Sequence, residues 1–507
     1  MRRAEGYVAW MSEQENIEPP FTKRLTSWLS TLYYGIPCRI LNDNFEAGRF
    51  NALFPARYDD GTRVMVRISK PSFTLHGDEK IHREVAVLKY LRQNTSIPVP
   101  RVYTWGTSKD NSSGLGPFII MELLRGVPLS AIVRDEPDMR LTISQVPEES
   151  LRTVYRQLAG YMLELSQHRF SHIGSLIIPT DQVHDTFTDQ ARDKPEVAPP
   201  FTCKMHDTEA KGGVPEGGLQ GATVSSSSAE YYKRVLDHTW QRLSRQHNSV
   251  ENEDDARYKF ITYKQMSAAL SEFISDDMDA AGSRLLSDDF WANDVLVKNK
   301  FNLKIVAIVD LEWTNTMPYY TFASPPRWLA LHEPEYLRDH EVPVYARCLE
   351  IFLQELRRHE GESTVEALDY WPGQAVKQTE SDNDLVPFDD SDNTCFMRIP
   401  PPQNPRGQSL STVMRENWDS GRFWFHEALR SNAISNEFRP WDRLVKRYPY
   451  LKDFYKIDED EVDAFVQRKM ADRRRYDTEW AEQCEEHLKK KRKIKEARKG
   501  ERKENET

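Results

Sequence analysis

The stretch Ser283–Trp313, SRLLSDDFWANDVLVKNKFNLKIVAIVDLEW, contains two short apolar runs of the kind that form β-strands. The first run, 295–297, follows an aspartate, and the second run, 304–309, ends at another. Between them, Asn299-Lys300 is a turn signal. The pattern predicts an antiparallel hairpin with acidic residues at its open end.

These acidic residues lie where the hairpin would begin and end. Backbone pairing brings the residues before one strand close to those after its partner, so we expect Asp289, Asp294 and Asp310 to lie together. Clustered carboxylates repel one another unless a cation lies among them, and Mg²⁺ is usually held by one or two carboxylates plus substrate phosphates. The pattern therefore predicts a metal-binding cluster, and the alternative is a set of solvated loop acids.

Composition limits the classes of protein to which the chain can belong. Its 507 residues, 39% of them hydrophobic, are enough for two globular lobes with additions. The formal net charge of −10 argues against a nucleic-acid binder, which needs a surplus of Lys and Arg on its binding face. The cysteines are scattered, odd in number and without a C-x-x-C pair, which indicates a reducing compartment and no structural zinc. They are Cys38, Cys203, Cys348, Cys395 and Cys484.

Targeting signals are weak. No apolar run approaches the length of a membrane span, so no membrane partner is expected. The first twenty residues mix arginines with glutamates, which makes a poor secretory or mitochondrial leader. We therefore expect a cytoplasmic protein. The basic run Lys489–Lys493, KKKRK, also allows a nuclear location, although charge pairing along a solvated helix explains this run equally well.

A second hairpin is predicted within Phe45–Ser69. Asp60-Gly61 is a turn signal between two strand-like arms. In the second arm apolar residues alternate with others, so Arg67 faces away from the apolar side. Gly48 lies near the start of the first arm, where a backbone could approach a ligand closely.

The segment 79–92 is predicted to be a helix, because its apolar residues recur at helical spacing. Glu84 lies beside the apolar stripe, so its carboxylate needs a cationic partner. Arg67 on the preceding strand is the natural candidate. Pairing of Glu84 with Lys80, with Arg83 or with water is equally compatible with these residues.

Two further segments complete the first lobe. In TSIPVPRVY, 95–103, the prolines enforce an extended path out of the helix. The apolar run PFIIMELL, 117–124, predicts a buried strand, and Gly126 after it predicts a hinge between two lobes.

The order of these parts resembles the protein-kinase-like fold, and the motifs resemble the aminoglycoside phosphotransferase family, in particular its large fungal branch. The motifs that carry the resemblance are FEAGRFN, VMVRIS, TSIPVP, SDDFWANDVLV, IVDLEWT and PPRWLAL, between about Phe45 and Glu350, and NWDSGRFWFHEALR at Asn417–Arg430. The resemblance implies an α+β, bilobal fold, with a small antiparallel-sheet N-lobe and a larger, mainly helical C-lobe.

The resemblance also implies roles for individual residues. Arg67 would hold the ATP phosphates, oriented by Glu84, and Gly48 would lie in the glycine-bearing loop above them. Asp289 would be the catalytic base that accepts the proton of the substrate hydroxyl. The remaining implied residues bind the cofactors ATP and Mg²⁺: Met121 and Glu122 would meet adenine through backbone groups, and Asp294 and Asp310 would hold the metal.

The chain departs from the family pattern at three positions. Ser287 stands where the family usually has a histidine, which supports the loop without doing chemistry. Asp294 stands where the family has a metal-binding asparagine, and its extra negative charge favours metal binding and disfavours metal-free nucleotide. Leu311 replaces a tryptophan, with Trp313 two positions later.

The resemblance, together with composition shifts, implies five regions. We expect an N-terminal helical extension at 1–44, a kinase-like N-lobe at 45–125 and a C-lobe at 126–372. A glycine- and serine-rich stretch at about 206–228 predicts a flexible insertion in the C-lobe, and 373–408 predicts a disordered linker. Residues 409–507 are expected to form a C-terminal helical segment with a charged tail.

The resemblance implies an ATP-dependent phosphotransferase that transfers the γ-phosphate to a hydroxyl of a small molecule. The alternative is a catalytically degenerate pseudokinase that acts as a nucleotide-binding or scaffold module, an interpretation favoured by Ser287 and Asp294. The sequence identifies neither the acceptor nor the oligomeric state.

Overall fold

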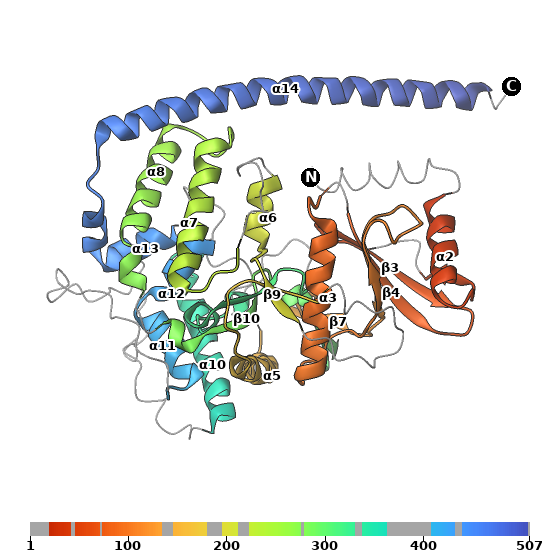
Figure 1. Ribbon diagram of the computed structural model, residues 1–507, viewed down its shortest axis with the longest axis horizontal. Helices are drawn as coiled ribbons and strands as arrows, with labels where there is room; N and C mark the ends of the chain where they lie inside the picture. Colours follow the sequence, from red (N-terminus) through yellow and green to blue (C-terminus); the bar gives the residue numbers. More distant parts are fainter. Residues whose placement is uncertain are drawn as a thin grey trace, which may run out of the picture.

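The computed structural model describes residues 20–41, 46–70, 73–133, 146–179, 195–210, 223–274, 278–329, 337–361, 407–430 and 439–504. The chain has a bilobal, protein-kinase-like α+β fold (Figure 1). A sheet-containing N-lobe lies at one end of the molecule and a larger, mainly helical C-lobe at the other. This is the fold class expected from the sequence.

The N-lobe is built on a six-stranded antiparallel sheet with the order β1-β3-β4-β6-β5, in which β2 pairs with β3. The Asp60-Gly61 hairpin joins β3 to β4, and Gly61 has a φ of +95°, which glycine adopts without strain. The strands are β1 (Cys38–Ile40), β2 (Glu46–Ala47), β3 (Asn51–Tyr58), β4 (Arg63–Ser69), β5 (Val102–Gly106) and β6 (Phe118–Glu122).

One helix covers each face of this sheet (Figure 1). Alternation along β4 turns Val64, Val66 and Ile68 toward α2 (Phe21–Leu32) and Arg67 toward α3 (Gly77–Asn94). Trp28 of α2 packs edge-on against Phe118, with ring centroids 4.5 Å apart. The N-lobe therefore has an apolar core on one face and a charged interior on the other.

The C-lobe places the helices around three small sheets. Its long core helices are α5 (Glu148–Gln167) and α10 (Val342–Glu360), which pack against each other. The other helices are α4 (Leu129–Val133), α6 (Cys203–Ala210), α7 (Ser228–Arg245), α8 (Glu253–Ala268), α9 (Tyr319–Phe322), α11 (Leu410–Asp419), α12 (Arg422–Arg430), α13 (Pro440–Arg447) and α14 (Glu459–Glu504). Short 3₁₀ turns lie at Leu270–Phe273, Asp279–Ala281, Ala292–Asp294, Arg327–Leu329 and Pro449–Phe454.

The hairpin predicted around Asn299 is present as β11 (Val295–Asn299) paired with β12 (Asn302–Ile308), with Val295 opposite Ile308. β7 (Val127–Pro128) pairs with the other edge of β11. A side chain at Gly126 would meet Leu296 and Val306 at about 3 Å, so this glycine is needed for close packing on the hairpin. The remaining strands pair as β8 (Ser175–Ile177) with β9 (Glu196–Ala198) and β10 (Ser283–Ser287) with β13 (Thr314–Pro318).

The structure changes the expectation for the segment 206–228. His206 to Ala210 are not part of a flexible insertion, because they form the second half of α6 and several of their side chains are buried. Glycine and serine dominate only the residues after this helix, of which 211–222 lie outside the described residues. The predicted linker 373–408 also lies outside them, except for its last two residues.

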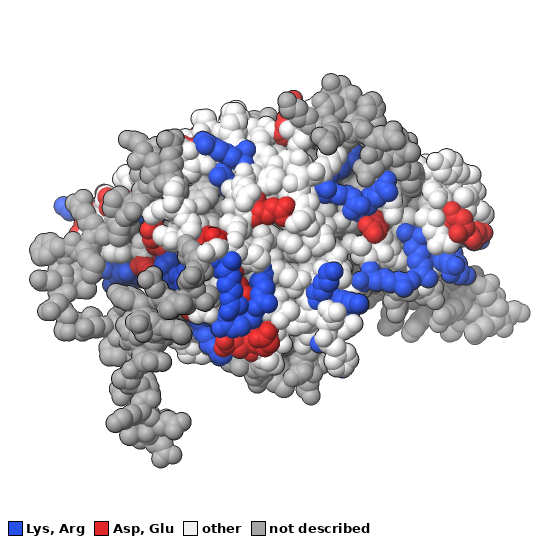
Figure 2. Space-filling view, turned by 90° about the horizontal axis from the view of Figure 1, so that it is seen from below, with Lys and Arg blue, Asp and Glu red and all other residues white. Residues whose placement is uncertain are grey.

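The C-terminal region is helical, and it ends in a single helix of 46 residues, α14. Its first turns pack through Val462 and Phe465 on α7 and α8. Beyond these contacts α14 runs along the length of the molecule (Figure 1). On the face shown in Figure 2, acidic and basic side chains are interspersed among uncharged ones. None of the described helices is long and apolar enough to span a membrane.

Truncation of Trp28 tests whether α2 is part of the N-lobe core. We expect Trp28→Ala to lower the free energy of unfolding by about 3–5 kcal/mol, because it leaves a cavity against Phe118. Lys23→Ala, an exposed position on the same helix, is the control. Denaturant unfolding measures the free energy of unfolding of both variants. If both lose the same small amount, α2 does not contribute to the N-lobe core.

Candidate functional site

Arg67 lies at the centre of a buried ion-pair network between the two lobes. Its side chain is 4% exposed, and its Nη1 donates to Oε1 of Glu84 on α3 at 2.6 Å. Of the partners that the sequence left open for Glu84, the structure has Arg67. Because desolvation of Glu84 outweighs the attraction of Arg67, the pKa of this carboxyl is raised.

The same arginine reaches the segment that follows β12. Nη2 of Arg67 donates to Oδ1 of Asp310 and to Oε2 of Glu312, each at 2.6 Å. Asp310 has a φ of +58°, a left-handed conformation that aspartate tolerates better than most residues, and its side chain is 48% exposed. One guanidinium therefore joins the N-lobe sheet, α3 and the end of the Asp-rich hairpin.

Three residues of this network were not expected from the sequence. Lys80 on α3 is fully buried, and it forms an ion pair with Glu312 and donates to Oδ1 of Asn51 at 2.7 Å. Asn51 in turn donates to Oε2 of Glu312 at 2.7 Å. Although burial alone would raise the pKa of Glu312, Lys80 and Arg67 lower it to about 2. The signals were available in the acid two residues after Asp310 and in the asparagine that ends FEAGRFN.

Asp289, the expected base, lies after β10, on the C-lobe side of the site. Nε1 of Trp291 donates to its Oδ1 at 2.8 Å and holds the carboxylate in place. Burial raises the pKa of Asp289, and Asp288 and Asp310 raise it further. At the end of β10 the hydroxyl of Ser287 is buried without a hydrogen-bond partner among the described residues. Among the described residues, no hydrogen bond from the Ser287 side chain holds this loop.

Asp294 lies in the 3₁₀ turn before β11 and is 8% exposed. Its Oδ2 accepts from the backbone N–H of Trp291 at 2.7 Å, and its carbonyl accepts from Val309 N–H at 2.9 Å. The second bond fixes Asp294 to the end of β12, just before Asp310. Burial, with the nearby charge of Asp310, raises the pKa of Asp294 to about 8.

The two hairpin carboxylates fit a magnesium site of the kind completed by phosphate oxygens. Among the described residues no group of three or more His, Cys, Asp or Glu side chains could hold a metal by itself. Asp294 and Asp310 nevertheless supply the oxygen ligands that Mg²⁺ prefers, and the raised pKa of Asp294 indicates that a nearby cation would stabilise its charged form.

The glycine-bearing loop between β2 and β3 is held by contacts with both lobes. Gly48 lies at an exposed position where an added side chain would meet nothing closer than 4.0 Å, so the fold itself does not require glycine there. Nζ of Lys70 donates to the carbonyl of Gly48 at 2.6 Å. The next residue, Arg49, forms an ion pair with Asp207 of α6. A C-lobe helix therefore holds the loop over the site.

The residues expected near adenine lie in β6, where the chain leaves the N-lobe. Met121 is buried and pairs with β4 on one side and β5 on the other. The backbone N–H of Glu122 donates to Arg101 at 2.8 Å. The chain leaves the sheet after Glu122, at Leu123, and contact of Met121 and Glu122 with adenine stays a prediction.

Trp313 lies in a separate aromatic cluster. It is 1% exposed and packs against Phe50 of the glycine loop and Phe201 before α6, with ring centroids 5.1 and 5.2 Å away. Leu311, where the family usually has tryptophan, is buried in the main core. The tryptophan at 313 thus connects the glycine loop to the Asp-rich hairpin.

The buried ion pairs can be tested by a double-mutant cycle. Glu312→Gln should cost about 3–5 kcal/mol of unfolding free energy, because it leaves the buried charge of Lys80 without its counter-ion. Adding Lys80→Met should recover part of that loss, since no uncompensated ammonium then remains. Denaturant unfolding measures the three variants. A double variant that loses the sum of the single losses would contradict the pairing.

The raised pKa of Asp294 makes stability depend on pH. Without metal, the folded state keeps this proton up to about pH 8, whereas the unfolded state loses it near pH 4, so stability should fall as pH rises between these values. Asp294 contributes at most about 1.4 kcal/mol to this fall for each pH unit, and Asp294→Asn should remove that contribution while the contributions of Glu84 and Asp289 remain. The free energy of unfolding of the natural protein and of Asp294→Asn is measured at several pH values in buffer that contains a chelator. The same pH dependence in both proteins would refute the prediction.

The comparisons with known proteins agree with this geometry. A model described as "Phosphotransferase enzyme family" (APH) matches residues 45–313, more than half of the chain. Altered inheritance of mitochondria protein 9 of Debaryomyces hansenii is 28% identical over 143 residues, which are 27% of this chain and 21% of that protein. The protein of the same name from Meyerozyma guilliermondii is 22% identical over 304 residues, 55% of this chain and 48% of that protein.

Among solved structures, a macrolide 2'-phosphotransferase type I has a TM-score of 0.37 and 12% identity, over 85% of this chain and 96% of that one. The matches to the two curated relatives span only about a fifth and about half of their lengths. Both relatives are named mitochondrial, so the expectation of a cytoplasmic location is overturned. On the match to residues 45–313, the chain belongs to the phosphotransferase enzyme family.

Proposed function

We propose that this protein transfers the γ-phosphate of ATP to a hydroxyl of a small molecule. The observation that carries the proposal is the position of Arg67, which bonds at once to Glu84 of α3 and to Asp310 beyond the Asp-rich hairpin. In a phosphotransferase this places a fixed cation beside the proposed metal ligand, where a triphosphate needs its charge neutralised.

The nucleotide would lie between the lobes. Arg67 would hold its phosphates, with Glu84 fixing the arginine, and the loop at Gly48 would cover them. Asp294 and Asp310 would hold Mg²⁺ together with phosphate oxygens. Bound Mg²⁺ and nucleotide supply the phosphoryl group and neutralise its negative charge.

The acceptor would be activated by Asp289. Its carboxylate would take the proton from the acceptor hydroxyl as that oxygen forms a bond to phosphorus and the bond to the leaving diphosphate breaks. Trp291 keeps the carboxylate oriented through its 2.8 Å hydrogen bond. The raised pKa of Asp289 makes it a stronger base than a solvated aspartate.

The alternative function is a degenerate, nucleotide-binding relative without catalysis. Its support is the unpartnered hydroxyl of Ser287 and the acidic residue at 294. Asp289 favours the enzyme, because a relative that only binds nucleotide does not need a base.

We also propose a mitochondrial location, supported by the names of the two curated relatives. Subcellular fractionation of the tagged, full-length protein tests this proposal, and recovery outside the organelle would refute it.

Nucleotide binding is tested by thermal unfolding with ATP, with and without Mg²⁺. At about a hundred times its Kd, a ligand stabilises the native state by about 2.7 kcal/mol, which raises the midpoint measurably. We expect a Mg²⁺-dependent rise in the natural protein and none in Asp310→Ala. Asp237→Ala, an exposed acid on α7, is the matched control and should behave like the natural protein. If no condition raises the midpoint of thermal unfolding, the proposed nucleotide site is refuted.

Catalysis is tested separately with Asp289→Asn. This variant should keep the Mg²⁺-ATP stabilisation but lose about 10²–10⁴-fold in phosphate transfer, the usual contribution of a general base. Phosphate transfer is followed by ADP release over a panel of hydroxylated acceptors. Transfer at an unchanged rate would show that Asp289 is not the base.

A further inference from the structure

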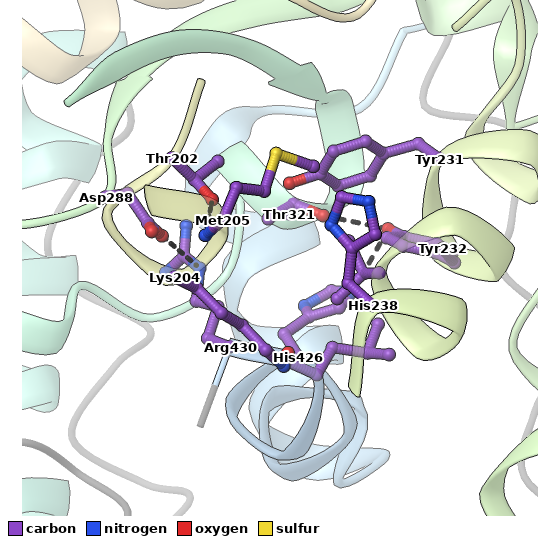
Figure 3. Close-up of a pocket in the computed structure, with 12 residues that line it drawn as sticks. Thr202, Lys204, Met205, Tyr231, Tyr232, His238, Asp288, Thr321, His426 and Arg430 are labelled. Carbon is purple, nitrogen blue, oxygen red and sulfur yellow. Dashed lines mark hydrogen bonds and ion pairs between the residues drawn. The ribbon is translucent and has the colours of Figure 1, made fainter. Parts of the chain in front are cut away.

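A small cavity, lined by both apolar and polar side chains, lies on the C-lobe side of the proposed catalytic residues, between α6, α7 and α12 (Figure 3). Lys204 of α6, Arg430 of α12 and Asp288 lie on one side of it, and Tyr231 and His238 of α7 on the other. Asp288 immediately precedes the proposed base. Because Asp288 lines the cavity and is the chain neighbour of Asp289, the cavity is beside the proposed base.

Among the described residues, the cavity lining has a hydrogen-bond donor on Arg430 and an imidazole nitrogen on His238 to which nothing bonds. Nη2 of Arg430 and Nδ1 of His238 are both buried without a hydrogen-bond partner among the described residues. The other contacts of Arg430 are loose: Nε lies 3.5 Å from Asp288 and Nη1 lies 3.9 Å from Glu427. A buried donor without an acceptor costs about 1–3 kcal/mol, so a bound acceptor group would remove a penalty that the empty cavity retains.

The charges around the cavity favour an anion. Lys204 and Arg430 are cations, whereas Asp288 is the one acid among the residues that line it. Glu427, the other acid near Arg430, is engaged by Arg327 at 3.0 Å. Burial and the charge of Lys204 lower the pKa of His238 to about 4, as expected where positive charge dominates. The cations in the lining therefore outnumber the one acid.

The size of the cavity narrows the choice of group. Its volume of about 30 Å³ holds roughly two water-sized groups. That matches the two oxygens of a carboxylate, and it is too small for a sugar ring. A planar guanidinium such as that of Arg430 binds a carboxylate through two hydrogen bonds.

We propose that this cavity binds the carboxylate of the acceptor, so that the substrate is a small hydroxy acid whose hydroxyl faces Asp289. The proposal rests on the proposed function, which it deepens by assigning the substrate class. Arg430 and Lys204 determine specificity, and they disfavour acceptors that carry amines in place of the acid.

The experiment uses matched acceptors that differ in one group: glycerate, glycerol and 3-aminopropane-1,2-diol, together with longer hydroxy acids and their corresponding alcohols and amino alcohols. Each is tested on the full chain with Mg²⁺-ATP, by ADP release and by thermal unfolding. The hydroxy acids should stabilise the protein and be turned over, and the amino alcohols should not. If no hydroxy acid stabilises the protein or serves as a better acceptor than its alcohol, the proposal is overturned.

Variants of the lining residues test which of them binds the carboxylate of the acceptor. Arg430→Gln should raise KM for the acid about tenfold to a hundredfold with little change in kcat, because it removes one charge-assisted contact. Arg430→Lys should restore part of the affinity, and Lys204→Met should repeat the effect. Arg447→Gln, an exposed arginine on neighbouring α13, is the control. An unchanged KM in a folded Arg430→Gln protein would overturn the proposal.

The outcomes separate this proposal from the general function. Phosphate transfer that prefers amino alcohols would support a phosphotransferase and refute the carboxylate site. In another outcome, hydroxy acids stabilise the natural protein but not Arg430→Gln, and no acceptor is phosphorylated. This outcome would support the carboxylate site and refute the proposed phosphotransferase activity.

Discussion

The fold depends on the requirement that charges buried between the lobes be paired. Arg67 and Lys80 are almost without water contact, and each would be costly to bury alone. Glu84 satisfies the arginine from α3, and Glu312 satisfies both cations from the far side of the interface. Because these partners come from three separate segments, the network fixes the sheet, α3 and the Asp-rich hairpin relative to one another.

The same requirement explains how the proposed metal ligands are held. Asp294 and Asp310 lie at opposite ends of the β11–β12 hairpin in the sequence, and the bond from Val309 N–H to the carbonyl of Asp294 brings them together. Asp310 takes a left-handed conformation and remains half exposed, whereas Asp294 is buried. One carboxylate is therefore presented to a ligand, and the other gains most from a cation that would favour its ionised form.

α6 connects the glycine loop to the small cavity of the C-lobe. Asp207 pairs with Arg49 of the loop, while Lys204 on the same helix reaches the carbonyl of Leu429 at the end of α12 and lines the small cavity. The backbone of Leu75 also donates to His206 at 3.4 Å. A helix that contacts both lobes can thus couple the position of the glycine loop to the shape of the cavity.

The sequence by itself determined the local elements: both hairpins, the helix containing Glu84 and the order of parts that indicates a kinase-like fold. These depend on alternation, helical spacing and turn residues, which act over a few positions. Only the tertiary structure decided that Lys80 pairs with Glu312 and Asn51, that α6 replaces the start of the expected insertion, and that Lys204, His238 and Arg430 share one cavity. Such contacts join residues far apart in the chain, and no local periodicity specifies which buried charge or donor will meet which partner.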